Sequence, residues 1–103
     1  MQRGEAWLIN LDPTVGAEIR KTRPAVIVSD DAMGILPLRV IVPITEWKDR
    51  YAVAPAADAF QVRSVSRERF VRRIGRLSGT AMQEITRALA LVLGVEVENP
   101  NHT

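Results

Sequence analysis

The chain has 103 residues, of which 47% are hydrophobic and 25% are charged, and its formal net charge is +2. This length and composition predict a single soluble globular domain over residues 1–103. Cysteine is absent, which excludes a disulfide framework, an iron–sulfur cluster and a thiol nucleophile. The only histidine is His102, so a histidine-based metal site and a histidine-driven catalytic triad are excluded as well.

The apolar and β-branched runs predict five strands, at residues 5–11, 24–30, 38–45, 60–66 and 69–77. The second run is apolar enough to predict burial on both faces, while Pro43 in the third indicates an edge strand or a bulge. Residues 30–34, DDAMG, predict a turn with a short helical piece.

A C-terminal helix is predicted after the last strand. Its apolar stripe has helical spacing and consists of Met82, Ile85, Leu89 and Val92. Ser78 or Thr80 can cap its start, and Gly94 is expected to end it. Short strands followed by one helix predict a small, mostly β, antiparallel barrel with an added α-helix. Leu91 and Leu93 lie off the stripe, which favours a second burial surface, most simply in a homodimer.

The charge is unevenly distributed. Twelve of the fourteen basic residues are arginine, and six of them lie between Arg63 and Arg76, where Glu68 is the only acid. Arginine binds phosphate in a bidentate manner and stacks on bases, so this segment favours a polyanionic partner. No signal peptide is recognisable, and the longest apolar run, residues 88–95, is too short to span a bilayer. We therefore expect a cytoplasmic protein without a membrane segment.

The remaining inventory permits an enzyme built from Arg, Glu, Thr, Ser and Gln. Cleavage of RNA by its own 2′-hydroxyl suits such a set, because the substrate supplies the nucleophile and an arginine can stabilise the phosphorane. Asp30 and Asp31 leave carboxylate-only magnesium binding open, although adjacent aspartates in a turn are more often turn formers. The residues alone permit RNA cleavage without requiring it.

Several motifs taken together resemble the MazF/PemK-type toxin family. RGEAWLINLDPTVGAEIRKTRPAVIVSDD, residues 3–31, carries an Arg-Gly-Glu start, a tryptophan, a Leu-Asp-Pro-Thr turn and an Arg-Pro before an apolar strand. VPIT at 42–45 resembles the family strand that ends in a threonine, and QVRSV at 61–65 resembles its second signature. The likeness covers nearly the whole chain.

The resemblance implies an SH3-like barrel of the MazF/PemK/CcdB type that forms a homodimer. Such toxins cleave single-stranded RNA, often messenger RNA, at short sequences, with no metal or other cofactor. The products carry a 2′,3′-cyclic phosphate and a 5′-hydroxyl, and a cognate antitoxin protein blocks the RNA site. The resemblance therefore implies a sequence-specific endoribonuclease toxin, an mRNA interferase.

By position, the resemblance assigns catalytic roles to Arg23, Thr45 and Glu18. Arg23 falls on the family's catalytic arginine and Thr45 on its active-site threonine, while Glu18 falls on a loop glutamate and is expected to accept a proton or organise the loop. The expected RNA-binding residues are Arg20, Lys21, Gln61, Arg63, Trp47, Lys48 and Arg50. Gln61 and Arg63 lie two apart on a predicted strand, so both are expected to face one groove.

Structural alternatives stand beside these roles. Arg23 could instead pair with Glu18 or Asp30, and the segment around Trp47 could be a hydrophobic lid rather than a clamp on single-stranded bases. Two other functions also fit the fold, because a barrel does not determine activity. One is a non-enzymatic toxin that inhibits gyrase, and the other is a plain RNA-binding barrel.

Overall fold

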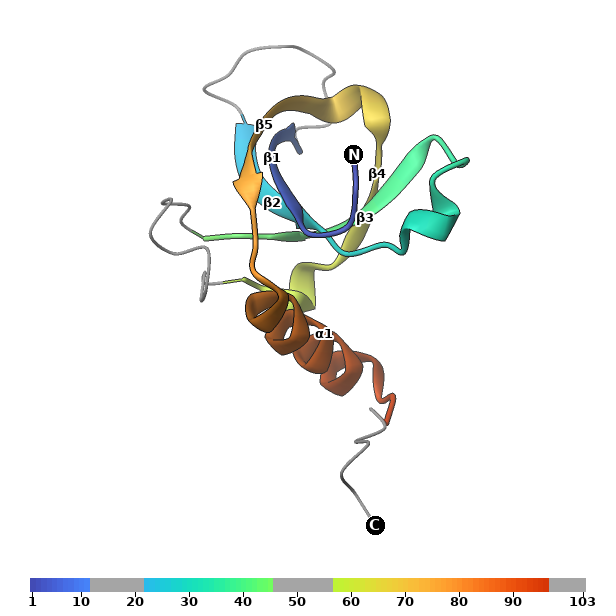
Figure 1. The fold of residues 1–103 in the computed structure, drawn as a ribbon, viewed down its shortest axis with the longest axis vertical. Coiled ribbons are helices and arrows are strands. Elements are labelled where there is room, and N and C mark those ends of the chain that lie inside the picture. Colours follow the sequence, from blue (N-terminus) through green and yellow to red (C-terminus); the bar gives the residue numbers. More distant parts are fainter. Residues whose placement is uncertain (12–21, 46–56, 97–103) are drawn as a thin grey trace.

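The computed structural model describes residues 1–11, 22–45 and 57–96, which form a five-stranded antiparallel sheet and a C-terminal helix (Figure 1). The strands are β1 (Glu5–Asn10), β2 (Thr22–Ile27), β3 (Leu38–Pro43), β4 (Arg63–Ser66) and β5 (Phe70–Arg76). The helix is α1 (Gly79–Leu93). Three short 3₁₀ turns join these elements: η2 (Asp31–Met33), η4 (Ala59–Gln61) and η5 (Arg67–Arg69).

The sheet has the order β4-β3-β2-β1-β5, and every neighbouring pair is antiparallel. From β4 the chain passes through η5 directly into β5, which pairs with β1 at the opposite edge. The strands therefore curl into the ring that Figure 1 shows above the helix. The expected small antiparallel barrel with a C-terminal helix is confirmed, although the described part of the sheet stays open between β4 and β5.

Two expectations about individual strands are wrong. β4 begins at Arg63 rather than at residue 60, because Asp58 caps a 3₁₀ turn over the preceding residues. β3 is an interior strand rather than an edge. Pro43 is tolerated there because it is the last residue of β3, and pairing with β4 has already ended at Ile41.

Strand β2 is buried on both faces, as its apolar run predicts. Ala25 and Ile27 lie in one apolar cluster, which we call the inner cluster because side chains of all five strands pack in it. Its members are Ile9, Ala25, Ile27, Ile41 and Val65, with Met1, Trp7, Leu11 and Phe70 at its margin. Val26 points to the other face, where it joins a second cluster beneath α1. The sheet is thus covered on both sides along β2.

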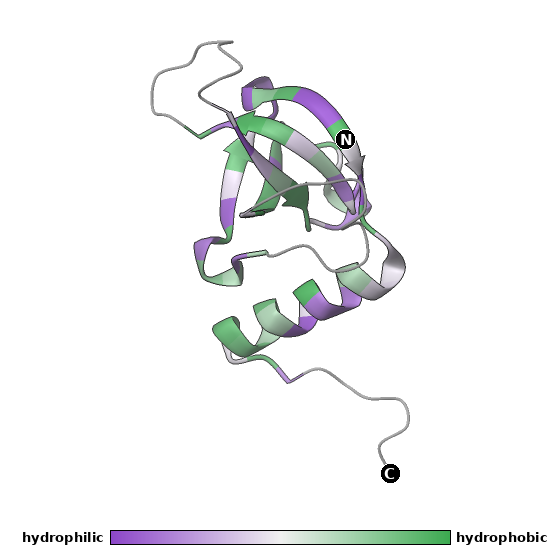
Figure 2. Ribbon diagram, turned by 90° about the vertical axis from the view of Figure 1, so that its left-hand side faces the viewer, coloured by the Kyte–Doolittle hydropathy of each residue, from purple (hydrophilic) through white to green (hydrophobic). Residues whose placement is uncertain are grey.

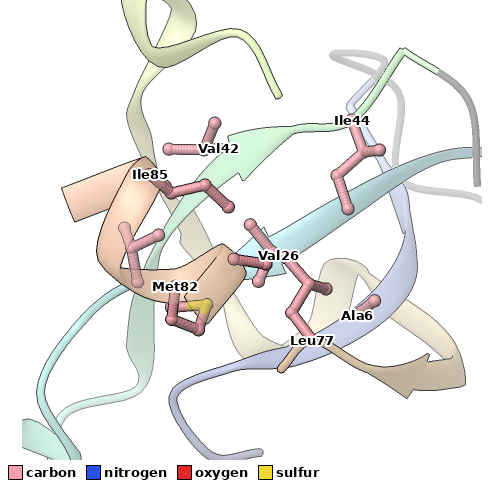
Figure 3. Packing of buried hydrophobic residues seen from close by; sticks show 9 residues of the cluster. Ala6, Val26, Val42, Ile44, Leu77, Met82 and Ile85 are labelled. Atoms are coloured by element: carbon pink, nitrogen blue, oxygen red, sulfur yellow. The ribbon is translucent and has the colours of Figure 1, made fainter. Parts of the chain in front are cut away.

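Helix α1 packs against the second cluster, here called the helix cluster. Met82 and Ile85 are buried and lie beside Val26 and Val42 of the sheet (Figure 3). The other buried members are Ala6, Val28, Ile44, Leu77 and Ala81. This arrangement confirms the burial expected for the first half of the apolar stripe, and it fixes the helix across the sheet.

The ends of α1 follow from its sequence. Ser78 is the N-cap and its hydroxyl accepts the Ala81 N–H at 3.1 Å, so of the two predicted caps Ser78 is the one used. Gly94 ends the helix at a φ of 71°, a conformation that favours glycine. Leu91 and Leu93 are 82% and 64% exposed, and Figure 2 shows the hydrophobic C-terminal end of the helix. Within the described ranges, no helix is both long and apolar enough to cross a membrane.

Removing the Ile85 side chain tests the packing of the helix on the sheet. We expect Ile85→Ala to lower the free energy of unfolding by about 2–5 kcal/mol, because it leaves a cavity between α1 and the sheet. Gln83→Ala, at an exposed position of the same helix, is expected to change it by less than about 0.5 kcal/mol. Urea unfolding at one fixed protein concentration measures both. Equal effects of the two substitutions would contradict this packing.

Candidate functional site

Arg23 lies in β2, next to buried Thr22 and just before the fully buried run that begins at Ala25. Its side chain is exposed, and Nη1 donates a hydrogen bond to the Thr22 carbonyl at 3.0 Å. It forms no ion pair with any residue that the structure describes. Asp30, an expected alternative partner, instead caps η2 by accepting the Ala32 N–H at 2.8 Å. Within the described ranges, no carboxylate neutralises the Arg23 guanidinium.

Thr45 lies just beyond the end of β3, near the end of its pairing with β2. The last pair of this ladder is Ala25 with Pro43, and the Ile44 N–H donates to the Pro24 carbonyl at 2.9 Å. Extending the register by two residues beyond that pair would set Thr45, which lies in a bend, level with Arg23. Both side chains are exposed. The roles of Arg23 and Thr45 at one site remain predictions.

The face on which these side chains emerge follows from strand alternation. Arg23 has the same parity as Ala25 and Ile27, so it lies on the face of the inner cluster, where that cluster ends. Arg63 pairs with Ile41 and shares this face. Ile41, the partner of Arg63, lies four residues before Thr45, which corresponds to about 13 Å of extended chain. Arg23 and Arg63 are thus both exposed on the face that carries the inner cluster.

Gln61 is placed differently from the expectation. It lies in η4 rather than on a strand, so it does not alternate with Arg63. Its Nε2 donates to Oδ2 of Asp58 at 2.8 Å. Arg63 is exposed and has no hydrogen bond or ion pair to the described part of the chain. The prediction that strand alternation gives the two side chains one direction is thus wrong, because a capped turn replaces the strand.

Six of the expected site residues lie outside the described residues: Glu18, Arg20, Lys21, Trp47, Lys48 and Arg50. Their assigned roles remain predictions. The same holds for the choice between a lid and a base clamp around Trp47, and for an ion pair of Arg23 with Glu18.

Glu5 is a buried carboxylate that the sequence reasoning did not single out. Its side chain is 8% exposed and lies on the inner face. Oε1 accepts the Gln2 N–H at 3.0 Å and the Trp7 indole N–H at 3.1 Å. The Met1 amino group lies 3.5 Å from the same oxygen. Residues 5, 7 and 9 of a strand point to the same face, so Glu5 shares its face with Trp7 and Ile9. This pattern is the sequence signal that could have indicated the burial of Glu5.

Two arginines of β5 complete the surroundings of Glu5. Its Oε2 lies 3.7 Å from Nε of Arg73 and 4.0 Å from Nη1 of Arg76. Burial by itself raises the pKa of the carboxyl. Hydrogen bonds and nearby positive charges outweigh that effect, so the pKa of Glu5 is lowered from its ordinary value of 4.5. Glu5 is thus an internal anion that joins β1 to β5.

The arginines between residues 63 and 76 therefore divide into two groups. Arg69, Arg73 and Arg76 have partners within the fold, the first through the Asn10 carbonyl at 3.3 Å. Arg67 and Arg72 are exposed and have no hydrogen bond or ion pair to the described residues. Part of this basic segment is thus structural, and part is exposed without a partner among the described residues.

Arg39 is a second buried charge that the sequence did not reveal. It is 9% exposed, and its guanidinium donates to the carbonyls of Leu36 and Leu38, each at 2.8 Å, and of Met1 at 3.2 Å. It holds the connection between β2 and β3 and has no role at the candidate site. Among the described residues, no group of three or more His, Cys, Asp or Glu could hold a metal ion.

A comparison with protein families matches residues 2–93 to a family described as PemK-like, MazF-like toxins of type II toxin–antitoxin systems. A curated relative, endoribonuclease MazF9 of Mycobacterium tuberculosis, is 34% identical over 113 aligned positions, covering 90% of this chain and 96% of the relative. Endoribonuclease PemK of Escherichia coli is 31% identical over 109 positions, covering 90% of this chain and 82% of PemK.

Solved structures show the same fold. A mycobacterial endoribonuclease in complex with its cognate antitoxin matches with a TM-score of 0.77 at 19% identity, covering 95% of this chain and 97% of that one. MazF of Deinococcus radiodurans matches with a TM-score of 0.71 at 23% identity, covering 92% and 97% of the two chains. At these identities the likeness concerns the fold.

The Glu5 network predicts a specific loss of stability in acid. Because the folded state lowers the pKa of this carboxyl, its contribution is fully present above pH 4.5 and is lost as the pH falls through the lower, folded-state value. We expect Glu5→Gln to lower the free energy of unfolding at pH 7 by about 1–3 kcal/mol, with a smaller difference from the parent at pH 3. Denaturant unfolding across this pH range measures both values.

Glu84→Gln, at an exposed position on α1, is the matched control and is expected to change stability little at either pH. A Glu5→Gln deficit that stays constant from pH 7 to pH 3 would show that the charge of Glu5 is not what stabilises the fold.

Proposed function

The chain belongs to the PemK-like, MazF-like toxins of type II toxin–antitoxin systems, and we propose that it is an endoribonuclease that cleaves single-stranded RNA, including messenger RNA, at short sequences in the cytoplasm. The observation that carries the proposal is the family match over residues 2–93, together with two curated relatives that are named endoribonucleases. A gyrase inhibitor and a plain RNA-binding barrel are not favoured, because neither activity is that of these relatives.

The proposed reaction uses a nucleophile of the substrate. The 2′-oxygen attacks the adjacent phosphorus, and the bond between phosphorus and the 5′-oxygen of the next nucleotide breaks. The products are a 2′,3′-cyclic phosphate and a 5′-hydroxyl. The protein has to orient the RNA, accept the 2′-hydroxyl proton and stabilise the negative charge of the phosphorane. None of these tasks requires a metal ion or an imidazole.

Arg23 is proposed to stabilise the phosphorane. Its exposure and the absence of an ion pair to any described residue support this role, because a guanidinium can donate several hydrogen bonds to phosphate oxygens. Pro24 restricts the backbone of Arg23 to extended conformations, so the side chain starts from a fixed direction. Thr45, which an extended register would set level with Arg23, is proposed to contact the same phosphate group. Glu18 is proposed as the proton acceptor or as an organiser of its loop.

The flanking RNA is proposed to follow the exposed basic residues. Arg63 lies on the same face as Arg23 and has no described partner, which suits a neighbouring phosphate. Gln61 is held by Asp58 at the start of β4 and can still present its amide oxygen. The remaining proposed RNA contacts are Arg20, Lys21, Trp47, Lys48 and Arg50.

Two protein partners are proposed as well. Leu91 and Leu93 expose a hydrophobic end of α1, which supports burial of this surface in a homodimer. A cognate antitoxin is the second partner, since solved structures of this fold include an endoribonuclease bound to its cognate antitoxin and a MazE–MazF complex. A negatively charged antitoxin segment over the basic face would exclude RNA by occupying the same guanidinium groups.

Removal of the Arg23 guanidinium tests the proposed reaction. We expect Arg23→Ala to lower kcat for cleavage of a long single-stranded RNA in EDTA by about 100- to 1,000-fold, because a donor to the phosphorane is lost. Arg87→Ala, which removes an exposed arginine of α1, is expected to leave kcat unchanged. Mapping the RNA ends measures cleavage and identifies the termini. Intact RNA with the parent protein at every concentration would overturn the proposed function.

A charge placed at the end of α1 tests the proposed homodimer. We expect the parent to sediment with the mass of two 11.4-kDa chains and Leu91→Glu to sediment as a single chain, because a carboxylate would be buried in the interface. Gln83→Glu introduces the same residue at another exposed position of α1 and is expected to keep the mass of the parent. A Leu91→Glu protein that remains dimeric would place the interface elsewhere.

A further inference from the structure

Phe60 is an aromatic side chain that the fold leaves almost entirely in solvent. It is 83% exposed, whereas Trp7 and Phe70, the other aromatic residues in the described ranges, are half-buried and pack edge to face with ring centroids 5.7 Å apart. An isolated exposed apolar residue is common, but here the backbone beneath the ring is tightly fixed.

The turn that carries Phe60 is anchored on three sides. Oδ1 of Asp58 accepts the Phe60 N–H at 3.1 Å, and the Asp58 N–H donates to the Pro43 carbonyl of β3 at 2.9 Å. Ala59, the preceding residue, is buried at 8% exposure. The structure thus holds the backbone of Phe60 rigid and exposes its side chain. This is the arrangement of a contact residue rather than of a core residue.

The turn that carries Phe60 packs against β3 and α1, and its neighbours in sequence include residues expected at the candidate site. Ala57, just before the capping Asp58, bridges to Ile44, the residue before Thr45. On its other side, Gln61 and Arg63 are exposed, and Arg63 has no partner among the residues described. Single-stranded nucleic acids stack their bases on exposed aromatic rings and neutralise their phosphates with exposed guanidinium groups, and this short segment offers one of each.

We propose that Phe60 is a stacking platform for one base of the bound RNA, with Arg63, three residues further along the chain, binding a phosphate of the same strand. This inference rests on the proposed function and adds a base contact to it. Stacking on a ring tolerates any base, so Phe60 contributes to affinity more than to the choice of cleavage sequence.

Substitutions at position 60 separate stacking from simple apolar contact. In an Arg23→Ala background, which is not expected to cleave appreciably, fluorescence anisotropy with a labelled mixed-sequence single-stranded RNA gives Kd. We expect Phe60→Ala and Phe60→Leu each to raise Kd by about 5- to 150-fold, because both lose the ring. Phe60→Trp is expected to bind at least as tightly as the background protein. Ile35→Ala, which truncates a 92% exposed residue between β2 and β3, is the matched control and is expected to leave Kd unchanged.

Two results would overturn the role of Phe60 while leaving the nuclease intact. The first is an unchanged Kd in Phe60→Ala, with the parent still cleaving RNA and Arg23→Ala still inactive. The second is normal binding by Phe60→Leu together with weak binding by Phe60→Ala, which would indicate apolar contact instead of stacking.

Sedimentation of the same variants distinguishes an RNA contact from a protein interface. We expect Phe60→Ala to keep the oligomeric mass of the parent. A loss of self-association would assign the ring to contact with a second copy and overturn the proposal. A parent protein that neither binds nor cleaves the RNA would overturn both this inference and the proposed function.

Discussion

The burial of β2 on both faces is the constraint on which the rest of the structure depends. Ala25 and Ile27 fill the inner cluster while Val26 fills the helix cluster, so a shift of register by one residue would exchange the two sets. Each large apolar side chain that lost its place would cost about 1.5–3 kcal/mol. The strand is therefore fixed along its axis. Arg23 is attached to this fixed strand just where the buried run stops, which gives an exposed, flexible side chain a rigid base.

Much of the fold could be predicted because its elements have strong local signals. The apolar run of β2, the spacing of Met82 and Ile85 on α1, and the glycine that ends the helix each have one dominant physical interpretation. The candidate site was not accessible in this way. The positions of Arg23 and Thr45 come from the resemblance to a toxin family, because the register between β2 and β3 that would relate them depends on the long-range pairing of two separate strands.

The parts that could not be predicted are those in which a polar side chain forms hydrogen bonds or ion pairs with residues far away in the sequence. Glu5 and Arg39 are normally surface residue types, and their burial depends on donors and carbonyls contributed by segments remote in sequence. The prediction that Gln61 lies on a strand is wrong for a local reason. Asp58 caps a 3₁₀ turn, and this cap overrides the alternating pattern that predicts a strand there.

The pairing of β1 with β5 also determines when the protein can become active during its synthesis. Glu5 pairs with Arg76, so this edge of β1 is covered only after β5 has been synthesised. Closing so long a loop is entropically costly and places the decisive contacts late in folding. A nascent or prematurely terminated chain therefore carries Arg23 without the finished sheet that orients it. For a chain proposed to cleave messenger RNA, this order of assembly delays the orientation of Arg23 until β5 has been made.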